Sequence, residues 1–137
     1  MTKEEKAALK AVTTFLKSYA KKNIDGCMAV LTKSESIMML GTNDNEIFKT
    51  TKSIRAAFKR DYKSMSDIHW GKRRNVYVKA SSTLAGVVIE MPISYNSEGE
   101  KVKAIFRYAM TLVKENEKWK ICAGIASVPF SSGAYSF

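Results

Sequence analysis

The stretch from Arg107 to Pro129 decides the fold. It begins Arg107-Tyr108-Ala109-Met110-Thr111, turns through Glu115-Asn116-Glu117, and returns as Trp119-Lys120-Ile121 to end at Ala126-Ser127-Val128-Pro129. The side chains alternate with a period of two on either side of a turn, which is typical of paired antiparallel strands. We therefore expect a hairpin whose strands cover about 102–114 and 119–128.

Further strands precede this hairpin. After Trp70 the period is again two, over about 70–79 and 83–95, and Asn96-Ser97-Glu98-Gly99 supplies a hairpin loop. Two short apolar segments lie earlier, at Ile37-Met38-Met39-Leu40 and Glu46-Ile47-Phe48-Lys49, with turn residues between them. These segments predict two short strands.

The N-terminal half has the helical period. Thr2 and Glu5 have the spacing of a capping box, and Thr50 or Thr51 can cap a later helix. Apolar residues recur at three and four positions in both segments: Leu9, Val12, Phe15, Leu16, Tyr19 and Ala20, then Ile54, Phe58, Tyr62 and Met65. A short helix lies between them. Helices followed by an antiparallel meander predict an α+β fold in which the helices cover one face of a bent sheet.

The composition indicates one domain. The chain has 137 residues, of which 45% are apolar and 26% charged. We assign residues 1–130 to a single domain and residues 131–137 to a loose tail. No apolar run approaches the ~18 residues that span a membrane, and the charged N-terminus lacks the pattern of a signal peptide. We therefore expect a cytoplasmic protein without membrane partners.

The net charge and the few cysteine and histidine residues limit the possible functions. There are 23 Lys and Arg against 13 Asp and Glu, a formal charge of +10. The basic residues between 49 and 63 fall on the polar side of a helix, so binding of nucleic acid is not favoured. Cys27 and Cys122 lie far apart among apolar neighbours and are expected to be free thiols. His69 is the sole histidine, so we expect no metal site and no cofactor.

The order of elements resembles the nuclear transport factor two-like superfamily, in particular its SnoaL-like domains, which are related to ketosteroid isomerases. The resemblance covers about residues 5–130. Its carriers are Asn23-Ile24-Asp25-Gly26, Leu40-Gly41-Thr42, Asn45-Glu46, Ser53-Ile54-Arg55, Lys59-Arg60-Asp61, the spacing of Arg107 from Trp119, and Ser127-Val128-Pro129. It implies a cone-shaped, curved antiparallel or mixed sheet around the N-terminal helices, a cystatin-like or SnoaL-like roll with a pocket on the concave face.

The same resemblance argues against the isomerase reaction. Alignment places Phe15 where the isomerase has its catalytic tyrosine, Met39 at its proton-shuttling aspartate, and Ala109 at its second acid. None of these side chains can transfer a proton. Ala123 and Ile125 stand where related SnoaL-like domains often carry histidines, so we expect these two residues in the pocket as well.

Other residues are candidates for the pocket. Alternation along the strand puts Arg107 on the same face as Ala109. One reading is an arginine fork that binds an anionic ligand, and the other is an internal ion pair or a side chain that extends to the pocket rim. Five aromatic residues are expected either to line or floor the cavity or to fill the core that continues from it: Phe15, Tyr19, Phe58, Tyr62 and Trp70. Asp61 and His69 are weak candidates for catalysis, and Asp61 is the acid to test first.

The opposite face of the same strand predicts an interface. It carries Phe106, Tyr108, Met110 and Leu112, and an apolar outer face needs a cover. The superfamily commonly forms dimers through its sheet, so we expect a homodimer through these residues.

Three functions remain open. The first is a module that binds an apolar or amphipathic small molecule, with an anionic ligand as a variant that depends on Arg107. The second is an enzyme of the lyase, isomerase or cyclase kind that uses a pocket carboxylate. The third is electrostatic binding to nucleic acid or an acidic protein. A carboxylate facing the cavity would favour the second.

Overall fold

A computed structural model describes residues 1–130, and within them the fold has the predicted α+β class. The helices are α1 (Lys3–Ala20), α2 (Ile24–Ala29) and α3 (Thr51–Ser64). The strands are β1 (Met38–Leu40), β2 (Ile47–Phe48), β3 (Met65–Trp70), β4 (Arg74–Ala80), β5 (Leu84–Ser97), β6 (Glu100–Glu115) and β7 (Lys118–Ser127). The loose tail predicted for residues 131–137 lies outside the described residues.

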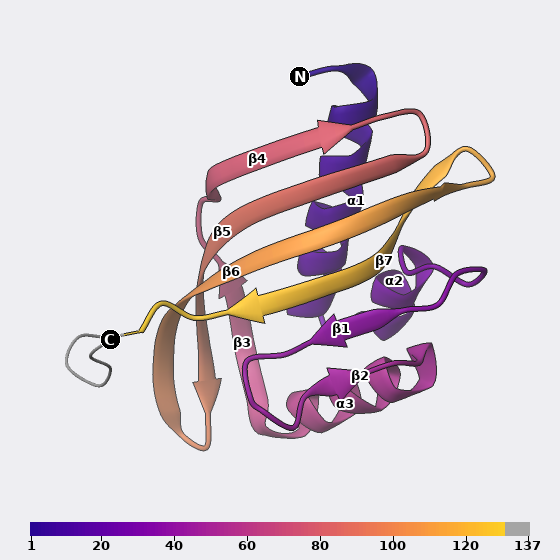
Figure 1. Cartoon of the computed structure of the whole chain (residues 1–137). Helices are drawn as coiled ribbons and strands as arrows, with labels where there is room; N and C mark the ends of the chain where they lie inside the picture. The colour runs from indigo at the N-terminus through magenta and orange to yellow at the C-terminus, as the bar shows by residue number, and fades with distance from the viewer. Residues whose placement is uncertain (131–137) are drawn as a thin grey trace, which may run out of the picture.

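All strands of the described chain join one curved, open sheet. Its order is β2-β1-β7-β6-β5-β3, and β4 also pairs with β5. β1 runs parallel to β7, and the other pairs are antiparallel. β5 and β6 stay in register over their whole shared length, from Leu84 opposite Val113 to Ser97 opposite Glu100. They form the long central hairpin in Figure 1.

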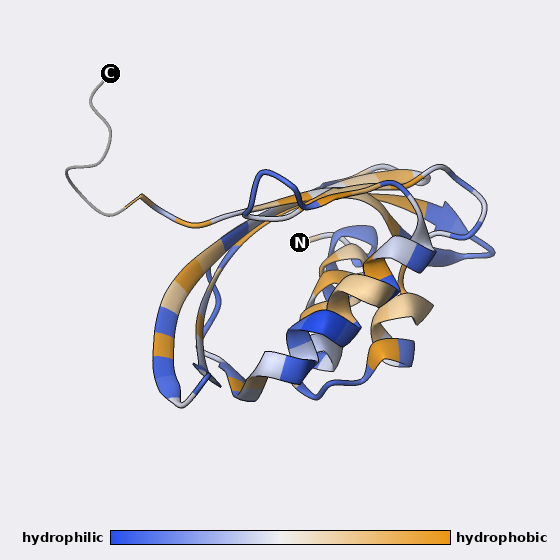
Figure 2. Cartoon of the chain, turned by 90° about the horizontal axis from the view of Figure 1, so that it is seen from below, coloured by the Kyte–Doolittle hydropathy of each residue, from blue (hydrophilic) through white to orange (hydrophobic). Residues whose placement is uncertain are grey.

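The helices lie inside the curve of the sheet, as Figure 2 shows. α1 begins at a complete capping box, in which the Thr2 hydroxyl accepts from the Glu5 N–H and the Glu5 carboxylate accepts from the Thr2 N–H. α3 begins at Thr50, whose hydroxyl accepts from the Ser53 N–H. The apolar stripe of α1 is buried against the concave face. None of the helices within residues 1–130 is long and apolar enough to cross a membrane.

One strand boundary differs from the prediction. The helical period of α3 includes Met65, but the helix ends at Ser64, and Met65–Trp70 forms β3. The length of β5 explains the difference, because its C-terminal part pairs with β3 and its N-terminal part pairs with β4. At the break between β3 and β4 the Gly71 N–H donates to the Pro92 carbonyl (2.8 Å). The strand predicted over about 70–79 is therefore β4, which begins only at Arg74, and β3 over Met65–Trp70 was not predicted.

A β-bulge changes which side chains of β7 face inward. The pairing of β6 with β7 shifts between Thr111 opposite Ala123 and Leu112 opposite Ile121, so Cys122 is the extra residue. Before the bulge Ile121 is fully buried. After it the inward position passes to Gly124, where an added Cβ would lie 3.2 Å from the Met39 side chain. A bulge reverses the alternation for the rest of its strand.

Candidate functional site

A cavity of about 250 Å³ lies between the two longer helices and the concave face of the sheet. α1 and α3 supply one wall, β6 and β7 supply the other, and the β1–β2 segment closes one end. Most of its lining is apolar or aromatic, with polar side chains from Thr42, Asn43, Glu46 and Asp61. The remaining side chains that line it include Phe15, Tyr19, Met39, Phe48, Phe58, Met65, Tyr95, Phe106, Tyr108 and Met110.

A tyrosine–aspartate pair forms the polar centre of this cavity. The Tyr19 hydroxyl, from the last turn of α1, donates to Oδ2 of Asp61 on α3 (3.0 Å). Within the described residues no hydrogen bond reaches Oδ1 of Asp61. The second carboxylate oxygen is therefore available to a ligand.

Helical spacing brings these groups together. Phe15 and Tyr19 are four residues apart on α1, and Phe58 and Asp61 are three apart on α3, so each pair shares one face. The Phe58 ring packs against Tyr19 and Phe15, with centroids 5.3 and 5.8 Å apart. The Tyr62 hydroxyl donates to the Tyr19 carbonyl (2.7 Å) and ties α3 to the end of α1.

The surroundings shift the pKa values of the polar groups. Burial raises the pKa of Asp61 above its usual range, and the nearby Glu46 carboxylate raises it further, although the Tyr19 hydrogen bond and Arg60 oppose the rise. Burial and the Asp61 charge raise the pKa values of Tyr19 and Tyr108 well above that of a free phenol. Both tyrosines therefore keep their protons at neutral pH, and Tyr19 uses its proton to donate to Asp61.

Five of the predicted pocket residues lie in the cavity lining: Phe15, Tyr19, Met39, Phe58 and, at its rim, Ile125. Tyr62 and Trp70 lie behind the wall instead. The Trp70 indole N–H donates to the Leu16 carbonyl (2.6 Å), and its ring packs edge-on against Phe106 and Tyr108, which do line the cavity. These two aromatic residues therefore support the site without contacting its interior.

The prediction for the two faces of β6 is wrong. Phe106, Tyr108 and Met110 line the cavity, and Leu112 is fully buried in the core, so this face cannot form a dimer interface. Arg107 and Ala109 are exposed on the outer face. The alignment that placed Ala109 in the pocket shifted the strand by one residue, and a shift of one exchanges the two faces of a strand.

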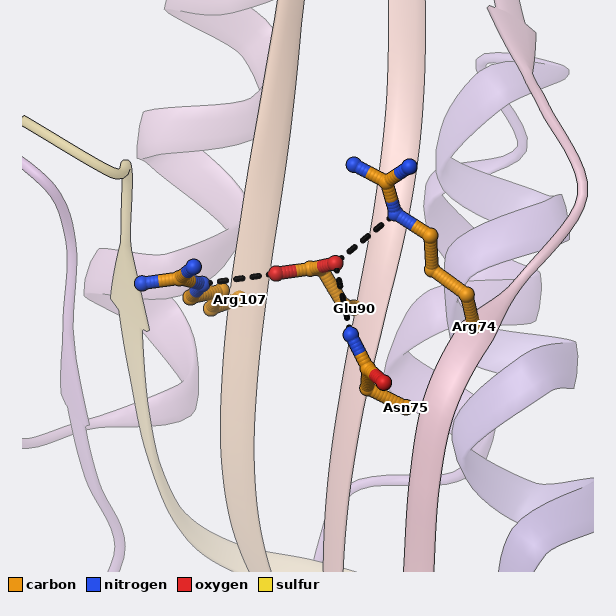
Figure 3. Close-up of polar contacts among 4 residues, drawn as sticks. All are labelled: Arg74, Asn75, Glu90 and Arg107. Carbon is orange, nitrogen blue, oxygen red and sulfur yellow. Dashed lines mark hydrogen bonds and ion pairs between the residues drawn. The ribbon is translucent and has the colours of Figure 1, made fainter. Parts of the chain in front are cut away.

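Arg107 has an internal partner on the outer face of the sheet (Figure 3). Its Nε donates to Oε2 of Glu90 (2.7 Å), while Arg74 Nε and Asn75 Nδ2 donate to Oε1 (2.8 and 3.0 Å). The hydrogen bond from Arg107 is the main cause that holds the pKa of Glu90 below its usual value. Of the two readings of Arg107, the internal ion pair is correct, and an anionic ligand held by Arg107 in the cavity is excluded.

Ala123 and Ile125 are displaced by the bulge at Cys122. Ala123 contributes to a shallow hollow on the outer face. Ile125 is 48% exposed and touches both this hollow and the rim of the cavity. The inward positions after the bulge are Gly124 and Ala126.

Of the two candidates for catalysis, only Asp61 lies in the cavity. His69 is exposed on β3, with Nε2 3.2 Å from the Asp67 carboxylate, and it lies outside the cavity lining. Cys27 and Cys122 are free thiols, as predicted. No group of histidine, cysteine or acidic side chains within residues 1–130 is arranged to hold a metal ion.

Sequence reasoning missed several lining residues. Phe106, Tyr108 and Met110 were assigned to the wrong face, and Tyr95 was not considered. The signal for the first three was present in the strand itself, because this is its more apolar face and the apolar face of a sheet packs against the core.

The chain belongs to the SnoaL-like domain family, whose pattern matches residues 8–131. This confirms the resemblance and the fold class. No curated protein matches the sequence.

Solved structures with the same fold include proteins of several descriptions. A ketosteroid isomerase-like protein from Erwinia carotovora atroseptica has a TM-score of 0.80 and 14% identity, covering 96% of this chain and 100% of that one. A protein of unknown function with a cystatin-like fold from Nostoc punctiforme has a TM-score of 0.77 and 14% identity, covering 96% of each chain. An NTF2-like protein of unknown function from Pseudomonas putida has a TM-score of 0.76 and 13% identity, covering 93% and 88%. At these identities the likeness shows the fold alone.

Proposed function

We propose that this protein binds a small, largely apolar molecule in the cavity, with one polar end of the ligand at Asp61. The observation that carries the proposal is the Tyr19–Asp61 pair, which places one free carboxylate oxygen in a lining that is mostly apolar or aromatic. Small-molecule sites have this composition, in which a few polar groups orient a ligand that apolar walls enclose. The volume of about 250 Å³ lies just below the usual ~300–1,000 Å³, so the ligand is small.

A pair of matched variants on α3 tests this proposal. Ala57 is buried and lines the cavity, whereas its neighbour Ala56 is exposed. The probes are neutral one-ring and two-ring compounds such as 4-ethylphenol and indole, with thermal unfolding as the readout. A ligand at 100 times its Kd stabilises the folded state by ~2.7 kcal/mol.

The two variants have opposite expected outcomes. Ala57→Leu fills the cavity and should abolish the thermal shift, and Ala56→Leu should retain it. If neither compound stabilises the wild-type protein, or if both variants respond equally, binding in this cavity is ruled out for this class of ligand.

A second candidate function is proton transfer by Asp61. The elevated pKa of a buried carboxylate suits a general base near neutral pH, and the Tyr19 hydroxyl already orients the group (3.0 Å). Asp61 would remove a proton from carbon next to a carbonyl group, as a lyase or isomerase requires. A carboxylate that faces the cavity is the feature expected to separate an enzyme from a binding module, and Asp61 favours the enzyme.

Deuterium exchange tests the catalytic candidate without knowledge of the natural substrate. The α-protons of 2-indanone in D₂O are followed by NMR. The wild-type protein should accelerate the exchange, and Asp61→Asn should return it to the buffer rate. Asp44→Asn removes an exposed carboxylate outside the lining and should leave the rate unchanged. Equal rates for wild type and Asp61→Asn would eliminate this function for such ketones.

We also propose that the protein is a homodimer, formed through the outer face of the sheet. Tyr77, Val88, Ala109 and Ile125 lie side by side in one row across four strands. The Tyr77, Val88 and Ile125 side chains are 58%, 47% and 48% exposed. Gly86, Ala109 and Ala123 line a shallow hollow in this face, and an exposed apolar face of this kind fits a second copy of itself.

Sedimentation velocity at micromolar concentration tests the dimer. The wild-type protein should sediment as a dimer, and Val88→Lys should convert it to a monomer. Ala56→Lys, on the exposed side of α3, serves as the control and should remain dimeric. A monomeric wild-type protein would disprove the proposal.

A further inference from the structure

The cavity carries acidic charge although the chain as a whole is basic. The formal charge is +10, yet the charged side chains among the described residues that line the cavity are Glu46 and Asp61. Screening limits the reach of surface lysines to ~8 Å at physiological ionic strength. The Arg60 charge on α3 also acts on Asp61, but Arg60 does not line the cavity, so both charges in the lining are negative, and they favour a cation over an anion.

Aromatic rings beside Asp61 add to this preference. The Tyr19 ring carries the hydroxyl that donates to Asp61, and the Phe58 ring lies 5.3 Å from it, between centroids. Tyr108 also lies within electrostatic reach of Asp61. Aromatic rings attract a cation within ~6 Å of the centroid, and desolvation strengthens the attraction.

Glu46 is held where its charge acts on the cavity. Its Oε1 accepts from the Asn43 backbone N–H (2.9 Å), and the chain turns back here as the Gly41 N–H donates to the Glu46 carbonyl (2.8 Å). The side chain is thus fixed in the loop between β1 and β2 and belongs to the lining.

We propose that the ligand is a small arylalkyl amine, bound as its ammonium ion. The ammonium donates to the free Oδ1 of Asp61, and the ring lies among the aromatic side chains of the wall. This inference rests on the proposed binding function and specifies the charge of the ligand. A hydrogen bond from the alcohol to the Asp61 carboxylate is already charge-assisted, so the amine gains over an alcohol of the same shape through the Coulomb attraction of its own positive charge, and a carboxylate is repelled.

Three probes of nearly equal shape separate these possibilities: 2-phenylethylammonium, 2-phenylethanol and phenylacetate. Isothermal titration at pH 7.5 and physiological ionic strength gives a Kd for each. The expected order is amine, alcohol, acid, with the amine about tenfold tighter than the alcohol. Asp61→Asn should reduce the advantage of the amine to about twofold while the alcohol still binds. Asp44→Asn should preserve the full advantage.

The outcomes separate the ammonium inference from the binding function on which it rests. If the alcohol or phenylacetate binds as tightly as the amine, the ammonium inference is overturned and binding in the cavity stands. The ammonium inference is also overturned, and binding in the cavity stands, if the amine keeps its advantage over the alcohol in an Asp61→Asn variant that urea unfolding shows to be folded. If none of the three probes binds the wild-type protein, the binding function fails and the inference fails with it.

Discussion

Replacement of Leu112 by alanine tests which face of β6 points inward, and the whole description of the cavity depends on that orientation. Leu112 is fully buried and lies opposite Ala85 on β5 and Ile121 on β7. Its neighbour Thr111 is exposed on the outer face. Removal of a fully buried leucine side chain costs ~2.7–5.0 kcal/mol, whereas surface substitutions stay within ~0.5 kcal/mol.

The expected loss is a large part of the total stability. A domain of this kind has a free energy of unfolding of ~5–15 kcal/mol, so Leu112→Ala removes between a fifth and all of it. At about 4 °C per kcal/mol for this chain length, the melting temperature should fall by roughly 11–20 °C. Thr111→Ala should change it by ~2 °C at most.

Urea unfolding followed by tryptophan fluorescence measures both variants. The midpoint for Leu112→Ala should fall while the slope stays constant, because the surface exposed on unfolding is nearly unchanged. If Leu112→Ala does not fold, Leu112→Met gives a milder test with a cost below ~1.5 kcal/mol. Equal losses at Leu112 and Thr111, or a larger loss at Thr111, would show that the inward face has been misassigned.

Two further predictions concern pH and helix capping. Burial raises the pKa of Asp61 in the folded protein, so Asp61 ionises more readily in the unfolded chain. Its contribution to the free energy of unfolding therefore falls as pH rises from the unfolded pKa of ~3.9 through the folded pKa. Asp61→Asn should therefore gain stability relative to wild type across that window in urea titrations, and a constant difference at all pH values would contradict the raised pKa. Thr2→Ala should cost ~0.5–2 kcal/mol because it removes the capping box of α1. Thr13→Ala removes the same atoms inside α1, where the hydroxyl donates to the Lys10 carbonyl and caps nothing, so it should cost less. The reverse order in thermal melts would refute the capping role.

The sequence predicted the elements well because their signals are local. The capping box at Thr2, the helical period of α1 and the loops that join β5, β6 and β7 each lie within a few residues. The break between β3 and β4 is a different case. It depends on how a long β5 divides its partners between two strands, and such pairing across the sheet leaves no local pattern.

The candidate site was predicted only in part. Phe15, Tyr19, Phe58 and Asp61 come from helices, where a spacing of three or four fixes the shared face. On β6 the comparison with a distant family outweighed the more apolar face of the strand, and an error of one residue put Arg107 and Ala109 in the cavity. Strand alignments are sensitive to single shifts in a way that helices are not.

The bulge at Cys122 has a consequence for reading related chains. In a relative without this extra residue, the positions four and six residues after the one equivalent to Trp119 would face inward, whereas in this chain that count reaches Ala123 and Ile125, and the inward positions are Gly124 and Ala126. An ungapped alignment across the bulge therefore assigns every later residue of β7 to the wrong face of the sheet. Roles of residues at the end of β7 should accordingly be assigned between homologues from superposed structures.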